Sequence, residues 1–146
     1  MIVVDASVAA KWLLPEVGTP AALELQEGPD QLFAPDLIRP EVAGSITRRV
    51  WAENAKERLS LADVEAGCDR WFQLLERATI SLLPESDLLQ EAVRLSIAIK
   101  QTLPDCLYLT AARHLGAGLI TADRPFWKRA SPSYKRPTLL VGCEDN

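Results

Sequence analysis

Short apolar runs alternate with amphipathic, helix-like stretches along this sequence. The apolar runs have the length and the β-branched content of buried strands, and they cover residues 2–4, 32–34, 79–83, 119–121 and 138–141. Strands that alternate with helices usually pair in parallel through right-handed crossovers. We therefore predict an α/β fold, a three-layer α/β/α sandwich around a short-stranded parallel sheet of four or five strands.

The stretches between these runs carry the start and stop signals of helices, namely capping residues, prolines and glycines. Thr19 followed by Pro20, for example, predicts an N-cap and a first helical residue. The predicted helices cover residues 6–14, 19–26, 36–58, 60–75, 86–99, 104–116 and 125–130.

The longest predicted helix, residues 36–58, has an apolar residue at every fourth position from Ile38 to Val50. This spacing marks one buried stripe. Ser60 and Asp63 then stand three residues apart, as in a capping box at the start of the next helix. We expect these two helices to form a hairpin that projects from the sheet.

Composition fits one folded domain that spans residues 1–146, with 48% hydrophobic residues and a formal net charge of −4. The apolar runs are much shorter than the ~20 residues of a membrane-spanning helix. The N-terminus has no basic segment of the kind that opens a signal peptide. Three cysteines without a CxxC pair, and a single histidine, exclude an ordinary zinc site. We expect a cytoplasmic protein with no membrane partner.

Four acidic residues stand at the positions where such a fold places its chemistry. Asp5 follows the first strand, and Asp123 comes just after the strand 119–121. Glu41 begins the long helix after the second strand, while Asp105 begins the helix that leads into a later strand. Taken singly, each has an ordinary explanation as a helix cap, a first-turn acid or a solvated side chain. In a parallel fold, however, all four fall on one rim of the sheet.

Four neighbouring carboxylates repel one another unless a cation lies between them. Oxygen ligands without His or Cys select hard cations, so we expect Mg²⁺, with Mn²⁺ as a substitute. Such an ion polarises a scissile phosphate and lowers the pKa of a bound water. In this hypothesis Asp5 and Asp105 are the direct metal ligands. Glu41 and Asp123 complete the anionic cavity, through bound waters or by orienting the attacking water.

The four acids lie in short motifs, VVDAS at 3–7, PEVA at 40–43, PDCLYLTAA at 104–112 and LITAD at 119–123. Together these motifs resemble the PIN-domain family, and within it the VapC toxins of toxin–antitoxin pairs, over nearly the whole chain. The resemblance implies a Mg²⁺-dependent ribonuclease with a compact parallel-sheet fold. It also implies a homodimer that a cognate antitoxin protein holds inactive.

The resemblance assigns the family's four acids to Asp5, Glu41, Asp105 and Asp123. Ser7 and Thr121 match family positions near the metal, although both could equally be local caps. The chain departs from the family at Gly44, where members often carry Asn or another polar residue. This departure concerns substrate contacts from that turn rather than the metal site.

An acidic site needs nearby cations to attract RNA. Residues 124–136 contain five Lys or Arg residues and no acid, and they include Phe126, Trp127 and Tyr134. Basic residues interleaved with aromatic ones suit phosphate contact and base stacking. A second basic group along the helix 36–58 has the simpler explanation of a solvated charged face.

Other α/β families fit the sequence less well. A haloacid-dehalogenase-type phosphatase needs a second Asp two residues after Asp5, where this chain has Ser7. A receiver domain needs an acidic pair near the first strand, and neither GxGxxG nor GxxxxGK[ST] is present for a nucleotide-binding fold. The alternative that stays open is a catalytically inactive PIN-like module that binds RNA or a protein partner.

Overall fold

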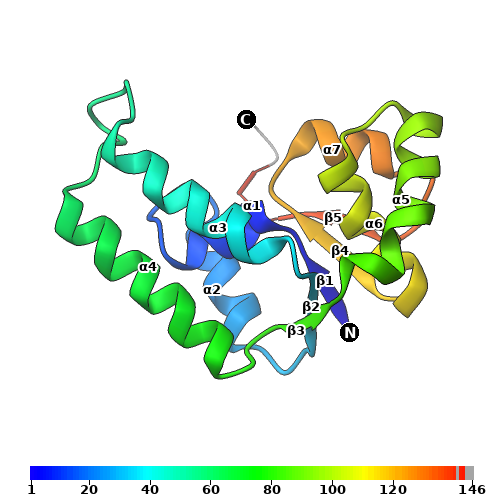
Figure 1. The fold of residues 1–146 in the computed structure, drawn as a ribbon, viewed down its shortest axis with the longest axis horizontal. Helices are drawn as coiled ribbons and strands as arrows, with labels where there is room; N and C mark the ends of the chain where they lie inside the picture. Colours follow the sequence, from blue (N-terminus) through cyan, green and yellow to red (C-terminus); the bar gives the residue numbers. More distant parts are fainter. Residues whose placement is uncertain (141, 144–146) are drawn as a thin grey trace.

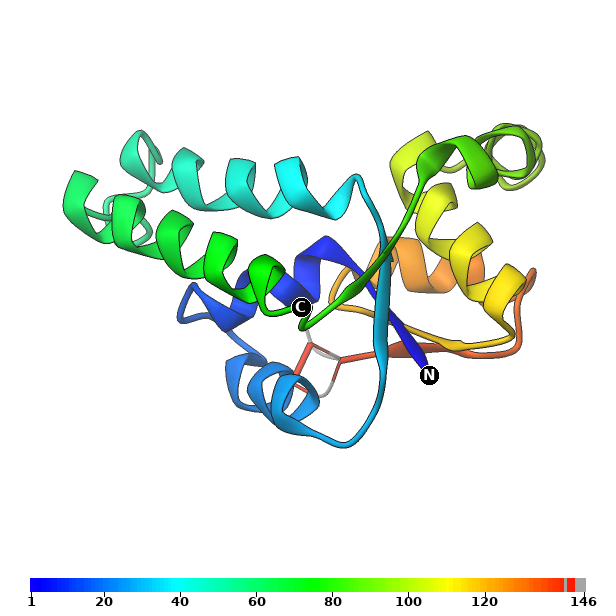
Figure 2. The same ribbon diagram turned by 60° about the horizontal axis from the view of Figure 1, so that its bottom comes forward.

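The computed structural model describes residues 1–140, 142 and 143, and it has the predicted three-layer α/β/α architecture (Figures 1 and 2). A parallel five-stranded sheet lies between two groups of helices. Its strands are Ile2–Val4 (β1), Leu32–Pro35 (β2), Ser81–Leu83 (β3), Gly118–Thr121 (β4) and Pro137–Leu139 (β5). The last predicted strand therefore starts one residue earlier, and its final residue, 141, lies outside the described residues.

Strand order in the sheet is β3-β2-β1-β4-β5, which places β1 at the centre. From β1 the chain first builds outward through β2 to β3. It then crosses back to β4 on the other side of β1 and ends with β5. The winding direction thus reverses between β1 and β4, and in open α/β sheets the crevice at the carboxyl ends of such a strand pair is the usual binding site.

The helices divide between the two faces of the sheet. In Figure 1 the helices between β1 and β3 lie to the left of the sheet and those between β3 and β5 to the right. None of the described helices is long and apolar enough to cross a membrane. The helices are Ala6–Ala9 (α1), Thr19–Glu27 (α2), Ile38–Thr47 (α3), Leu61–Glu76 (α4), Glu85–Ile99 (α5), Leu103–Leu115 (α6) and Arg124–Ala130 (α7), with 3₁₀ turns at Ala10–Trp12 (η1) and Arg48–Val50 (η2).

Helices α3 and α4 run side by side and extend away from the sheet, which agrees with the expected hairpin (Figure 1). The fully buried Trp71 of α4 donates from its indole nitrogen to the Arg39 carbonyl of α3 at 3.1 Å. At the start of α4 the Ser60 hydroxyl accepts from the Asp63 amide at 3.1 Å, as its capping box predicts.

The prediction of one helix over residues 36–58 was wrong in its second half. Helix α3 ends at Thr47 and tightens into η2, and residues 51–60 form a loop. The apolar stripe ends at Val50, so nothing beyond it favours burial of a helix face. Instead the Asn54 side chain accepts from the Lys56 amide at 3.1 Å, a local bond that competes with helix formation.

The N-cap of α2 was also misplaced by one residue. Gly18, at a φ of 84°, occupies that position, and Thr19 is already helical. The Thr19 hydroxyl instead accepts from the Glu16 amide at 2.9 Å and donates to the Leu14 carbonyl at 3.2 Å. The Thr19 side chain therefore stabilises the turn before α2 rather than capping the helix.

Candidate active site at the carboxyl ends of β1 and β4

Asp5 directly follows β1 and lies beside the carboxyl end of β4, where its amide donates to the Ile120 carbonyl at 3.0 Å. Its side chain is almost completely buried, and its Oδ2 accepts from the hydroxyls of Ser7 at 2.5 Å and Thr121 at 2.7 Å. Asp5 occupies the N-cap position of α1, yet its carboxylate makes no capping bond. Helix capping therefore does not explain the presence of an acid here.

Three carboxylates influence one another electrostatically around this position. Burial raises the pKa of Asp5 to about 6, because the charged carboxylate loses its hydration. The hydrogen bonds from Ser7 and Thr121 oppose this rise, whereas the carboxylates of Asp105 and Glu41 add to it by repelling a charge on Asp5. The structure thus brings Asp5, Asp105 and Glu41, which lie far apart in the sequence, within electrostatic range of one another.

Glu41 projects from the first turn of α3 and is bound by a tyrosine of α6. The Tyr108 hydroxyl donates to Glu41 Oε2 at 2.7 Å. Burial raises the pKa of Glu41, with the Tyr108 bond opposing that rise and Asp105 adding to it. Burial and the nearby carboxylates raise the pKa of Tyr108 well above its ordinary range, so the phenol stays protonated and remains a donor.

Asp105 stands in the first turn of α6. Its amide donates to the hydroxyl of Thr102, the N-cap residue of α6. Its Oδ2 accepts from that same hydroxyl at 2.6 Å and from the side-chain nitrogen of Gln101. Both donors precede the helix, so the turn between α5 and α6 sets the direction of this carboxylate.

Asp123 follows β4 at the same edge of the sheet but is held differently. Its Oδ1 accepts from the Phe126 amide at 2.9 Å and so caps α7, as the simpler explanation proposed. Its amide donates to the Thr121 hydroxyl at 3.0 Å. The Thr121 hydroxyl, which also donates to Asp5, therefore links the two aspartates.

The four acids share one further feature. Each has one carboxylate oxygen held by hydrogen bonds and one that accepts no hydrogen bond from the described residues. Within residues 1–140, 142 and 143, no three Asp, Glu, His or Cys side chains are grouped tightly enough to hold a metal ion. Mg²⁺, however, commonly takes only one or two carboxylates and keeps several waters. The oxygen-only donor set therefore fits a hard cation bound by two of these acids.

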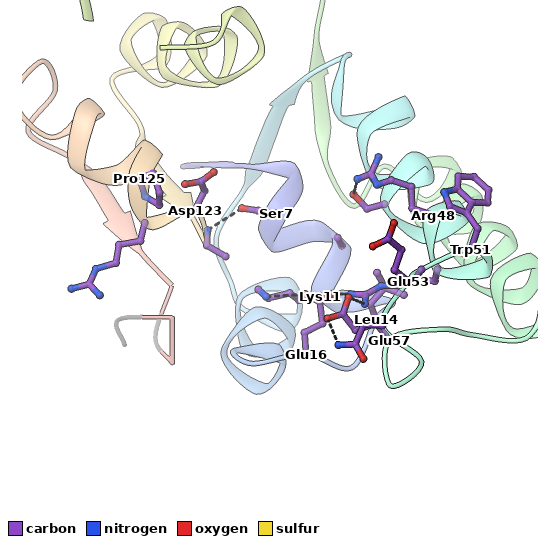
Figure 3. Close-up of a pocket in the computed structure, with 17 residues that line it drawn as sticks. Ser7, Lys11, Leu14, Glu16, Arg48, Trp51, Glu53, Glu57, Asp123 and Pro125 are labelled. Carbon is purple, nitrogen blue, oxygen red and sulfur yellow. Dashed lines mark hydrogen bonds and ion pairs between the residues drawn. The ribbon is translucent and has the colours of Figure 1, made fainter. Parts of the chain in front are cut away.

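A groove of about 860 Å³ begins at Ser7 and Asp123 and extends to Arg48 and Trp51 (Figure 3). Charged side chains of both signs line it in equal number: Lys11, Arg48, Arg49 and Arg124 against Glu16, Glu53, Glu57 and Asp123. Glu16 pairs with Lys11 at 3.1 Å and also with Arg49. These pairs leave the groove walls without a net positive charge, so the groove itself does not explain attraction of a polyanion.

Comparison with known proteins agrees with this fold. The family model described as "PIN domain" matches residues 2–131. The chain belongs to the PIN domain family. Among solved structures, the fold is similar to that in "Crystal Structure of PAE2754 from Pyrobaculum aerophilum", with a TM-score of 0.66 and 20% sequence identity over 95% of this chain and 88% of that chain. No curated protein matches the sequence significantly.

PIN domains are generally nucleases, and they typically depend on divalent metal ions. In this PIN domain the aromatic residues near Asp123 differ from the stacking surface that the sequence suggested, because Phe126 is buried and Trp127 and Tyr134 are half-buried. Phe126 is fully buried, the Trp127 indole donates to the Pro137 carbonyl at 3.2 Å, and the Tyr134 hydroxyl donates to the Ala112 carbonyl at 3.1 Å. These three side chains hold α7 and the following turn in place.

Sequence reasoning gave no role to Tyr108, Gln101 or Thr102, although each binds one of the acids. A signal was available for Tyr108, because it follows Asp105 by three residues and therefore shares its helix face. Thr102 likewise has the spacing of an N-cap before Asp105. Gln101 could not be found in this way, since its contact depends on the turn that joins α5 to α6.

The Tyr108→Phe variant tests the link between α6 and α3. Without the phenol donor, we expect the pKa of Glu41 to rise further and the protein to lose about 1–2 kcal/mol of stability at pH 8. An NMR titration of the Glu41 carboxyl carbon and a urea denaturation measure the two effects. Tyr134→Phe is the matched control, because it removes a hydroxyl that binds backbone carbonyls only. An unchanged pKa of Glu41 in Tyr108→Phe would show that the bond has no effect on the acid.

Proposed function

We propose that this PIN domain is a Mg²⁺-dependent ribonuclease that hydrolyses RNA phosphodiester bonds with a metal-activated water. The observation that supports this most is the convergence of Asp5, Glu41 and Asp105 at the switch point of the sheet. Burial of mutually repelling carboxylates costs stability, and a structural role would not require it. A cation site explains why the chain retains them.

In the proposed mechanism Asp5 and Asp105 would hold the ion through the carboxylate oxygens that accept no hydrogen bond from the described residues. The ion, when bound, polarises the scissile phosphate and lowers the pKa of a water. Ser7 and Thr121 fix the direction of Asp5, and Tyr108 fixes that of Glu41. Glu41 and Asp123 complete the anionic cavity and orient the attacking water.

Cleavage of a structured RNA tests the activity. We expect product with Mg²⁺, none with EDTA, and at least a 100-fold lower rate for Asp5→Asn, since even outer-shell partners of a metal site contribute about 10–100-fold. Asp69→Asn, which changes an exposed acid on α4, is the matched control. Equal cleavage under all conditions would indicate a contaminating nuclease and would overturn the proposal. RNA binding without cleavage would instead support the inactive module.

The basic residues of α7 are the proposed contact for the RNA backbone. Arg124 and Lys128 are four residues apart and so lie on one helix face, next to Asp123. For the double change to Met we expect weaker RNA binding and a salt slope smaller by about 1–1.4, or ~0.7 for each phosphate contact with a single strand. A change to Met of Arg77, the C-cap residue of α4, removes charge on the other face of the sheet. An equal effect there would contradict a specific α7 contact.

We propose further that a cognate antitoxin protein neutralises the enzyme, as the resemblance to VapC toxins implies. Co-purification with the product of an adjacent small gene, and suppression of toxicity by it, test this part of the proposal. Absence of both would refute it.

The chain is also proposed to form a homodimer. Leu89, Val93 and Ile97 recur at every fourth position on α5 and are exposed, which is unusual for an apolar stripe in a monomer. We expect light scattering to give a dimer for the natural chain and a monomer for Ile97→Lys. A monomer for the natural chain would remove this part of the proposal.

A further inference from the structure

The turn between α5 and α6 holds a buried glutamine, Gln101, next to Asp105. Its backbone is fixed on both sides, because its amide donates to the Ser96 carbonyl at 3.3 Å and its carbonyl accepts from the Ser96 hydroxyl at 2.6 Å. Lys100, directly before it, has a φ of 54°, which turns the chain sharply at this point. The Gln101 side chain therefore starts from a well-defined backbone position.

Hydrogen-bonding chemistry fixes the orientation of the Gln101 amide. Arg129 of α7 donates from Nη1 to Gln101 Oε1 at 2.6 Å. A guanidinium can only donate, so the oxygen of the amide must face Arg129. The nitrogen then faces Asp105 and donates to its Oδ2. The reversed amide would set donor against donor at Arg129 and acceptor against acceptor at Asp105.

This arrangement determines which oxygen of Asp105 is available. Oδ2 accepts from both Gln101 and the Thr102 hydroxyl, while Oδ1 accepts no hydrogen bond from the described residues. With the Thr102 hydroxyl as its only donor, the Asp105 carboxylate could rotate about that single hydrogen bond. Two donors on one oxygen fix the carboxylate plane and therefore the direction of Oδ1.

We propose that Gln101 is a positioning residue, oriented by Arg129, that presents Asp105 Oδ1 as a single-oxygen ligand for the divalent cation. The inference rests on the proposed metal site, and it adds two residues that lie outside the four acids. Metal-bound side chains generally depend on such outer partners, and loss of one typically weakens metal binding about 10–100-fold.

The direction in which loss of Arg129 changes metal affinity distinguishes the positioning role from a direct electrostatic effect. Arg129 is cationic, so removing its charge near a cation site should by itself tighten metal binding. If Arg129 acts through Gln101, its removal should instead weaken binding, since the amide then loses the partner that fixes its oxygen and its nitrogen can rotate away from Asp105. Arg129→Lys keeps both the charge and a donor, and it should retain more of the affinity than Arg129→Met.

Mn²⁺ binding, measured by electron paramagnetic resonance of the free ion, tests the inference without any RNA. We expect about 10-fold weaker binding for Gln101→Met, a smaller loss for Arg129→Met, and no further loss when Arg129→Met is added to Gln101→Met. Because Arg129 is exposed, we expect its variants to fold normally. The unfolding temperature of each metal-free protein checks this.

Each result has one meaning. Wild-type affinity in Gln101→Met, or tighter binding in Arg129→Met, would overturn the positioning role while leaving the metal site intact. Additive losses in the double variant would show that Arg129 does not act through Gln101. Absence of Mn²⁺ binding by the wild type would overturn the metal site and the inference together.

Discussion

Metal-free Asp5→Asn protein is expected to be more stable than the wild type at pH 8, by up to about 3 kcal/mol. In the folded protein the pKa of Asp5 is raised to about 6, from an ordinary value of about 4. An acid whose pKa is raised in the folded state contributes to stability while it is protonated, and this contribution is lost as the pH rises through 6. The figure follows from about 1.4 kcal/mol for each pKa unit. Asparagine stays neutral, and its oxygen can still accept from Ser7 and Thr121.

Urea denaturation in EDTA between pH 4 and pH 8 measures this difference. The stability of the wild type should fall relative to that of Asp5→Asn across the interval, and the two proteins should converge near pH 4. Asp69→Asn, with its change at an exposed acid, should follow the wild type. Parallel curves of stability against pH for wild type and Asp5→Asn would show that burial does not raise the pKa of Asp5.

The second large effect is stabilisation by a divalent cation. At a Mg²⁺ or Mn²⁺ concentration of 100 times the dissociation constant, we expect a gain of about 2.7 kcal/mol at pH 8. For a chain of this size that corresponds to a rise in melting temperature of roughly 5–10 °C. A bound ion would relieve the repulsion between Asp5 and its neighbours Asp105 and Glu41, so the gain should depend on both proposed ligands.

Thermal unfolding of wild type, Asp5→Asn and Asp105→Asn, each with Mn²⁺ and with EDTA, measures this gain. Neither variant should show more than a small fraction of the wild-type rise. Asp69→Asn should show all of it. A full rise in Asp105→Asn would mean that the ion binds elsewhere, and the assignment of Asp105 as a ligand would then be wrong.

Together these two predictions describe a site in which the same residue lowers the stability of the metal-free protein and is required for the proposed activity. Asp5→Asn should stabilise the metal-free protein, because burial raises the pKa of Asp5, and it should remove the activity, because Asp5 is a proposed ligand of the cation. Asp123 differs from Asp5, since it caps α7 and its loss should cost stability as well.

The sequence was sufficient for the strands and for the acids at their ends. Buried parallel strands are short apolar runs, and the residue after each run falls on the functional rim whatever the loops do. The prediction of a helix failed at residues 51–60, because helical propensity does not indicate where a helix face stops being buried. The predicted stacking role failed at Phe126, which is fully buried, for a related reason. Composition identifies a basic aromatic segment, but only packing decides whether the rings face solvent or the core.

Gln101 and Arg129 mark the limit of sequence reasoning most clearly. Their bond joins the turn before α6 to α7, 28 residues further along the chain. No periodicity relates these positions, and neither residue type is specific to a metal site. Only the fold places Arg129 where it selects one orientation of the Gln101 amide.

Anomalous diffraction from crystals of this PIN domain soaked in Mn²⁺ tests the central claim most directly. The account predicts an anomalous peak at the carboxyl ends of β1 and β4, within ligand distance of Asp5 Oδ1 and Asp105 Oδ1. Asp105→Asn crystals treated in the same way should lose that peak. A peak that contacts neither residue, or its absence in well-soaked wild-type crystals, would contradict the account.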